Sequence, residues 1–105
     1  MPRCLVVLVT CPTRAVARRI ATALVTRRLA ACVNVMPVVH SIYRWQGKVE
    51  RAQEALLLIK TSTRRFAQAK RVVLALHPYE VPEVVALRLV DGHPAYLRWV
   101  ATSVS

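Results

Sequence analysis

The longest continuous pattern in the chain is a pair of strand-like arms on either side of Gln46-Gly47. The arms occupy residues 31–45 and 48–61 and are rich in Val, Ile, Leu and aromatic residues, which favour strands. Gln-Gly suits a two-residue hairpin turn. The pattern therefore predicts a long β-hairpin at about residues 31–61. Pro37 should mark a bulge or an edge position in it, because proline cannot donate a hydrogen bond to a sheet.

The predicted hairpin is too long for a small sheet. Each arm has about fourteen residues, whereas a usual strand has roughly 5–6. The tip must therefore stand in solvent or pair with another subunit. Ile42, Tyr43 and Trp45 near the tip favour pairing, and 55% of the chain is hydrophobic, more than a domain of this length readily buries. We expect the chain to form an oligomer.

Strands and helices alternate along the rest of the chain. The periodicities predict a buried strand, a helix, the hairpin, a second helix, a strand and a last short helix at residues 3–11, 13–29, 31–61, about 62–77, 84–90 and from Pro94 onward. Pro78 should end the second helix at His77, and Thr61, Ser62 or Thr63 should cap its start. This order predicts an α+β protein with the ferredoxin-like split βαβ arrangement (β-α-β-β-α-β plus a C-terminal helix), as a single domain over residues 1–105.

The charge of the chain is strongly positive, with 16 Lys and Arg against 5 Asp and Glu. Such a balance suits nucleic acid. However, the arginines are dispersed in runs of at most two, and the few aromatic residues that might stack on bases are mostly isolated. We expect salt-sensitive association with polyanions rather than specific nucleic-acid binding. A basic nucleic-acid-binding module remains an alternative function.

The N-terminal apolar run and the cysteines indicate a cytoplasmic protein. The run at residues 5–9 is shorter than the apolar region of a signal peptide. No run approaches the ~20 apolar residues that cross a membrane, so we expect no membrane association. Cys4, Cys11 and Cys32 are odd in number and lack CxxC spacing, which predicts no disulfide framework.

The segment HPYEVPE, residues 77–83, is the first candidate site. It places His77, Glu80 and Glu83 in a stretch that two prolines stiffen. Imidazole and carboxylates together suit a divalent ion such as Zn or Cu. The alternative is that His77 ends the preceding helix and the glutamates pair with arginines. Both interpretations are compatible with the sequence.

Cys11 and Cys32 form a second candidate, because each lies at the end of a predicted strand near the first helix. Thiolates suit a soft Cu(I) site, whereas cysteines at apolar strand positions are more often small core residues. The chain has only two glycines, so it lacks a glycine-rich phosphate loop, and no serine has a nucleophile-elbow setting. Acylphosphatase shares this size and strand order, but it needs a glycine-rich anion loop, so the lack of such a loop excludes it. We expect no catalysis.

Five parts of the sequence together resemble one known family. They are ALVTRRLAACVNV (23–35), SIYRWQGKV (41–49), LLLIKT (56–61), HPYEVPEVVAL (77–87), and the set Pro94, Tyr96, Leu97 and Trp99. In order and spacing they are similar to the CutA family of divalent-cation tolerance proteins, and they cover nearly the whole chain.

The resemblance implies a PII-like homotrimer in which the hairpin with Trp45 reaches neighbouring subunits. It also implies tolerance of divalent metals through metal binding, Cu(II) before Zn(II), without enzymatic activity. Ions would bind in pockets between subunits, with His77 and Glu83 as ligands and Glu80 beside them. Cys11 is a further candidate, because the cysteine proposed as a ligand in some members falls at Val9 here, two residues earlier.

The residues leave one more function open. A PII-like sensor would bind a small anionic ligand in clefts between subunits, with Lys60 and arginines as its cationic groups. In either function, Lys60, Tyr79, Tyr43 and Trp45 are expected at an intersubunit pocket or interface. The expected partners are therefore other copies of the chain and a metal ion or small anion.

Overall fold

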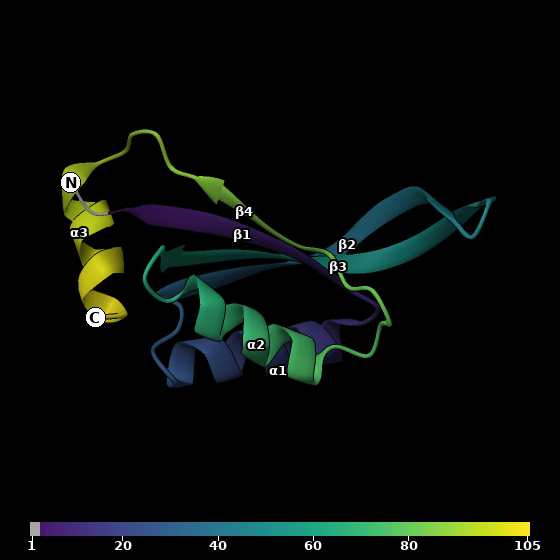
Figure 1. Ribbon diagram of the computed structural model, residues 1–105, viewed down its shortest axis with the longest axis horizontal. Helices are drawn as coiled ribbons and strands as arrows, with labels where there is room; N and C mark the ends of the chain where they lie inside the picture. Colours follow the sequence, from purple (N-terminus) through teal and green to yellow (C-terminus); the bar gives the residue numbers. More distant parts are fainter. Residues whose placement is uncertain (1–2) are drawn as a thin grey trace.

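The computed structural model describes residues 3–105 as a four-stranded sheet with helices α1 and α2 on one face (Figure 1). The elements are β1 (Cys4–Cys11), α1 (Arg14–Thr26), β2 (Cys32–Trp45), β3 (Lys48–Ser62), α2 (Phe66–Leu76), β4 (Val84–Arg88) and α3 (Pro94–Ser103). The strand order is β2-β3-β1-β4, and every neighbouring pair is antiparallel. The predicted split βαβ order with a C-terminal helix is confirmed. No helix within these residues is long and apolar enough to cross a membrane.

β2 and β3 form the predicted hairpin, which extends far beyond the other elements (Figure 1). Gln46 and Gly47 both have positive φ, at 50° and 80°, as a two-residue hairpin turn of matching twist requires. The pairing register shifts between Met36 and Val39, so Pro37 lies in the expected bulge. The hairpin accounts for the elongated shape of the chain, which measures 44 × 26 × 22 Å.

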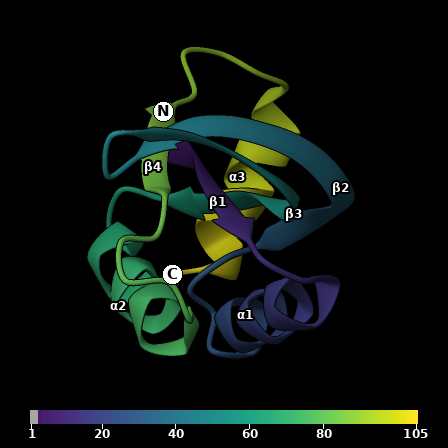
Figure 2. The same ribbon diagram turned by 90° about the vertical axis from the view of Figure 1, so that its right-hand side faces the viewer.

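The core lies between the sheet and the two helices, which run side by side beneath it (Figure 2). Alternate residues of the strands face the helices, because successive side chains of a strand point to opposite faces. The helices meet them with residues three or four apart. The central core residues are Val7, Val9, Leu57 and Ile59 of the sheet, Ala17, Ile20 and Leu24 of α1, and Ala69 and Val73 of α2.

The other face of the sheet is left largely open. α3 packs at one end of the sheet, where Leu97 and Val100 are buried with Cys4 (Figure 1). Elsewhere this face presents apolar side chains to solvent, including Val85 and Leu87, and the latter is 53% exposed. Within residues 3–105, one face of the sheet is thus well packed, and the other is apolar and uncovered except at the end where α3 packs.

α2 begins later than the sequence predicted. The expected start near Ser62 is wrong, because β3 continues to Ser62 in its pairing with β1 and a turn precedes Phe66. The expected hydroxyl cap is also wrong. The N-cap is Arg65, whose side chain makes no cap hydrogen bond, while the Thr61 hydroxyl donates to the Leu29 carbonyl oxygen over 2.7 Å.

We expect Leu24→Ala to lower the free energy of unfolding by about 2–5 kcal/mol, because it opens a cavity at a fully buried position of α1. Val25→Ala is the matched control. Val25 is 43% exposed on the same helix, so its truncation should cost less than about 1 kcal/mol. Urea denaturation at one fixed protein concentration measures both values. Equal losses in the two variants would contradict this packing.

Candidate functional site

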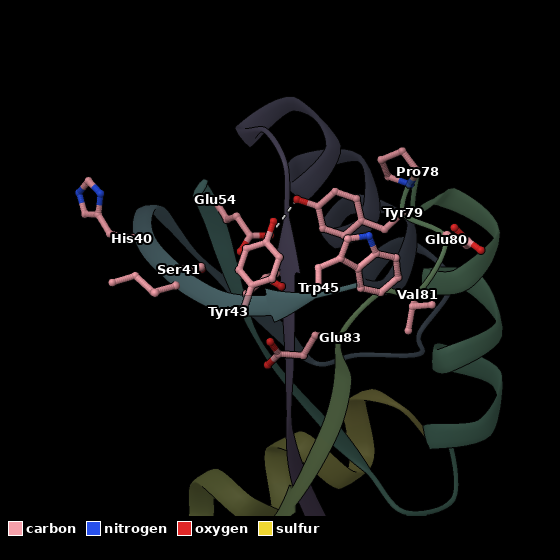
Figure 3. A pocket seen from close by; sticks show the side chains of 12 residues that line it. His40, Ser41, Tyr43, Trp45, Glu54, Pro78, Tyr79, Glu80, Val81 and Glu83 are labelled. Carbon is pink, nitrogen blue, oxygen red and sulfur yellow. Dashed lines mark hydrogen bonds between the residues drawn. The ribbon is translucent and has the colours of Figure 1, made fainter. Parts of the chain in front are cut away.

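A cavity of about 870 Å³ lies between the projecting hairpin and the loop that joins α2 to β4 (Figure 3). The hairpin contributes half of the lining residues, and the loop and the end of β1 supply the other half. The residues that line the cavity are Thr10, His40, Ser41, Ile42, Tyr43, Trp45, Glu54, Pro78, Tyr79, Glu80, Val81 and Glu83. Most of HPYEVPE and the aromatic residues near the hairpin tip therefore border one space.

The cavity gathers negative charge. Glu54, Glu80 and Glu83, three of the chain's 5 acidic residues, line it, although the formal net charge of the chain is +11. Glu80 and Glu83 are exposed, whereas Glu54 is buried. Carboxylate oxygens in a shared cavity attract cations, and divalent ions most strongly. The geometry therefore suits a cation better than an anion.

A hydrogen bond ties the loop to the hairpin across this cavity. The Tyr79 hydroxyl donates to the Glu54 carboxylate over 2.8 Å, as the dashed line in Figure 3 shows. Burial, this hydrogen bond and the negative charge of Glu54 raise the pKa of Tyr79 well above its ordinary value. The phenol therefore stays protonated and remains a donor throughout the neutral pH range.

His77 is buried, and both of its ring nitrogens contact the backbone. The Tyr79 N–H donates to Nδ1 over 3.2 Å, so Nε2 carries the proton and donates to the Thr10 carbonyl oxygen over 2.7 Å. His77 is also the C-cap of α2, where its N–H donates to the Val73 carbonyl oxygen. In one chain, His77 therefore ends helix α2, as the alternative interpretation of the sequence expected. A metal at either ring nitrogen would have to replace one of these bonds.

Cys11 lies in the core and is not among the residues that line the cavity. Its side chain is 0% exposed. Burial, and then the negative charge of Glu54, raises the pKa of the Cys11 thiol to about 11. Metals bind the thiolate, so a thiol that resists deprotonation fits the alternative role of a small core residue.

The structure brings together some of the proposed site residues and separates others. Glu80, Glu83, Tyr79, Tyr43 and Trp45 line the cavity. Lys60 does not, and its ammonium group instead donates to the Asn34 side-chain oxygen. Within residues 3–105, no three His, Cys, Asp or Glu side chains lie close enough together to hold a metal ion.

Sequence reasoning missed Glu54, Thr10 and His40. Glu54 is the buried acidic residue of the cavity, yet in the sequence it is an isolated carboxylate before an apolar run. Its place follows from pairing with Val39 immediately after the bulge. The predicted bulge near Pro37 was the sequence feature that bears on the pairing of Glu54. A bulge predicts that the pairing register between two strands shifts, but not by how many residues.

Three comparisons relate the chain to known proteins. The profile of a family described as "CutA1 divalent ion tolerance protein" matches residues 5–103. A Thermus thermophilus protein named "Divalent-cation tolerance protein CutA" is 58% identical over 95 residues, which cover 90% of this chain and 92% of that protein. The human protein named "Protein CutA" is 49% identical over 92 residues, 88% of this chain but 51% of that protein. The chain thus spans about half of the human relative.

Solved structures agree with these sequence relatives. The chain is similar to the divalent cation tolerance protein (Cut A1) from Thermus thermophilus, with a TM-score of 0.95 and 54% identity, covering 97% of this chain and 99% of that chain. It is also similar to CutA from Xylella fastidiosa, with a TM-score of 0.94 and 43% identity, covering 97% of this chain and 98% of that chain.

We expect the Cys11 thiol to resist modification in the folded protein, because burial raises its pKa and excludes reagents. The measurement uses Cys4→Ser/Cys32→Ser, in which Cys11 is the remaining thiol. Ellman's reagent at about pH 8 should release no chromophore from the native variant and one equivalent in urea. Rapid reaction of the native variant would place the thiol at an accessible position and revive Cys11 as a candidate ligand.

Proposed function

The chain belongs to the CutA1 divalent ion tolerance family, and from this premise we propose that it is a homotrimer that binds a divalent metal ion in the cavity beside the hairpin. The observation that carries the proposal is the collection of three of the chain's 5 carboxylates in that cavity. The role is tolerance of, or response to, metal ions, with Cu(II) preferred to Zn(II). The proposal assigns binding and no catalytic step.

Glu83 and Glu80 are the ligands that one chain would contribute. Both carboxylates are exposed and line the cavity, so they can bind a metal without breaking an internal bond. His77 is the imidazole nearest to them in sequence, but it would have to exchange a backbone hydrogen bond for the metal. Within residues 3–105 no three such ligands lie close together, and we propose that a neighbouring copy supplies the remaining ligands.

The uncovered apolar surfaces support the homotrimer. β2 and β4 are the edges of the sheet and leave backbone groups unpaired. The open face of the sheet is apolar, and the projecting hairpin presents exposed apolar residues, of which Ile42 is 68% exposed. Soluble monomers rarely leave so much contiguous apolar surface in water, and identical copies of the same chain are the partner that is always present.

We also infer a cytoplasmic location. All three cysteines are free in the structure, as they would remain in a reducing compartment. Two relatives carry names with other locations: an Arabidopsis thaliana protein is named "Protein CutA, chloroplastic", and an Archaeoglobus fulgidus protein of solved structure is named as periplasmic.

Light scattering at micromolar concentration should give three times the 11.8 kDa mass of one chain. Ile42→Glu should shift the mass toward the monomer, because it places a charge among the apolar groups of the hairpin. Val25→Glu is the control, since it places the same charge on an exposed position of α1. A stable wild-type monomer would contradict the assembly.

Calorimetric titration with Cu(II) and Zn(II) tests the metal site. Glu83→Gln should weaken Cu(II) binding at least about tenfold, because it removes one charged ligand. Glu50→Gln is the matched control, since Glu50 is an exposed hairpin carboxylate outside the cavity lining, and should change binding less than about twofold.

His77→Ala belongs in the same titration and separates two roles of the imidazole. Unchanged Cu(II) affinity would restrict His77 to its backbone hydrogen bonds. Equal affinity of wild type, Glu83→Gln and Glu50→Gln would contradict a metal site in this cavity.

A further inference from the structure

The outer face of the helix layer, meaning the solvent-exposed sides of α1 and α2 with their adjoining turns, carries only positive charge. Half of the chain's 16 Lys and Arg residues are exposed on it: Arg14, Arg18, Arg19, Arg27, Arg28, Arg64, Lys70 and Arg71. Residues 13–28 and 63–76 contain no Asp or Glu. These cations therefore have no acidic neighbour on their own helices to neutralise them.

A shallow depression on α1 shows how these groups are arranged. Three arginines, Arg18, Arg19 and Arg27, border it together with Thr22, Ala23 and Thr26. Guanidinium groups bind phosphate oxygens through two parallel hydrogen bonds, and threonine hydroxyls also donate to phosphates. Arg14 lies one helical turn before Arg18, about 6 Å along the axis, and extends the line of donors. The depression thus has hydrogen-bond donors suited to a phosphate group, and its lining residues include no carboxylate that would repel one.

The fold keeps this face separate from the cavity and from the open side of the sheet. The helices lie on one side of the sheet, opposite the uncovered apolar face (Figures 1 and 2). The acidic residues lie elsewhere, on β3, in the loop before β4 and in the loop before α3. If copies of the chain assemble through the apolar face, the helix layer therefore stays exposed to solvent. Its positive electrostatic potential then acts on the surrounding solution.

We propose that this face binds duplex nucleic acid through the phosphate backbone, independently of base sequence. Reading of bases in a single strand needs stacking platforms. The aromatic residue of the two helices is Phe66, which is partly buried in the core with the Lys70 ammonium 5.6 Å from its ring centroid. An anionic membrane is a poorer match, because insertion needs a broad apolar face. On these helices the exposed large apolar side chains are Val25 and Leu74.

The test is fluorescence anisotropy of the full chain with labelled DNA duplexes of about 20 base pairs and two unrelated sequences. Both duplexes should bind alike. The affinity should fall about a hundredfold between about 50 and 200 mM salt, as expected for roughly four phosphate contacts. Addition of a chelator should not change the result, so the outcome is independent of the metal site.

Two variants of equal net charge locate the contact. Arg14→Gln/Arg18→Gln removes two cations from the helix layer, and the salt slope should fall by about two. Arg88→Gln/Arg98→Gln removes two exposed cations on β4 and α3, and the slope should fall by less than about one. Light scattering should give each variant the same mass as the wild type. A loss of DNA affinity could then not be attributed to a change in assembly.

Three results would overturn the proposal. Equal loss in the two variants would assign binding to overall charge and not to this face. Absence of binding at about 50 mM salt, where phosphate contacts are strong, would show that the face does not bind duplex DNA. Binding to phosphatidylserine vesicles without binding to either duplex would identify a membrane partner instead.

Discussion

Pairing of β3 on both of its edges is the constraint on which the rest of the structure depends. β3 pairs with β2 along the hairpin, but its pairing with β1 ends where Cys11 meets Ala55. Beyond that point β3 has only β2 beside it, so the outer half of the hairpin leaves the sheet. Glu54 is the first residue past this point and is the one that Tyr79 holds. The sheet narrows at this point because β1 no longer pairs with β3. The cavity lies there, between the hairpin on one side and the α2–β4 loop on the other.

The alternation of side chains along β1 then decides which groups reach the cavity. Thr10 lines the cavity and offers its carbonyl oxygen to His77, whereas Cys11, one residue on, points into the core beneath the helices. Val9 has the same parity as Cys11 and is likewise buried in that core. Val9 and Cys11 are both 0% exposed and are not among the residues that line the cavity, whereas Glu80 and Glu83 are. The carboxylates of the loop, and not the thiols of the strand, are thus the groups that border the cavity.

The sequence predicted the features that local chemistry determines. The turn at Gln46-Gly47, the bulge at Pro37 and the end of α2 before Pro78 each depend on a few adjacent residues, and each was found. Features that depend on distant partners were not predictable. The start of α2 depends on how far β3 pairs with β1, and the partners of His77 include a carbonyl oxygen 67 positions away. Glu54 entered the cavity through a register shift whose size no local pattern gives.

The uneven charge distribution reconciles the proposed cation site with a strongly basic chain. A net charge of +11 would oppose cation binding if it acted uniformly. At physiological ionic strength, however, charges more than ~8 Å apart in solvent are largely screened, so the groups that line the cavity dominate the potential inside it. Those groups include three carboxylates and no Lys or Arg. The exposed arginines and the lysine of the helix layer lie outside the cavity lining, on a separate surface of opposite charge. Because screening limits the reach of each surface, the basic helix layer does not need to weaken a cation site in the cavity.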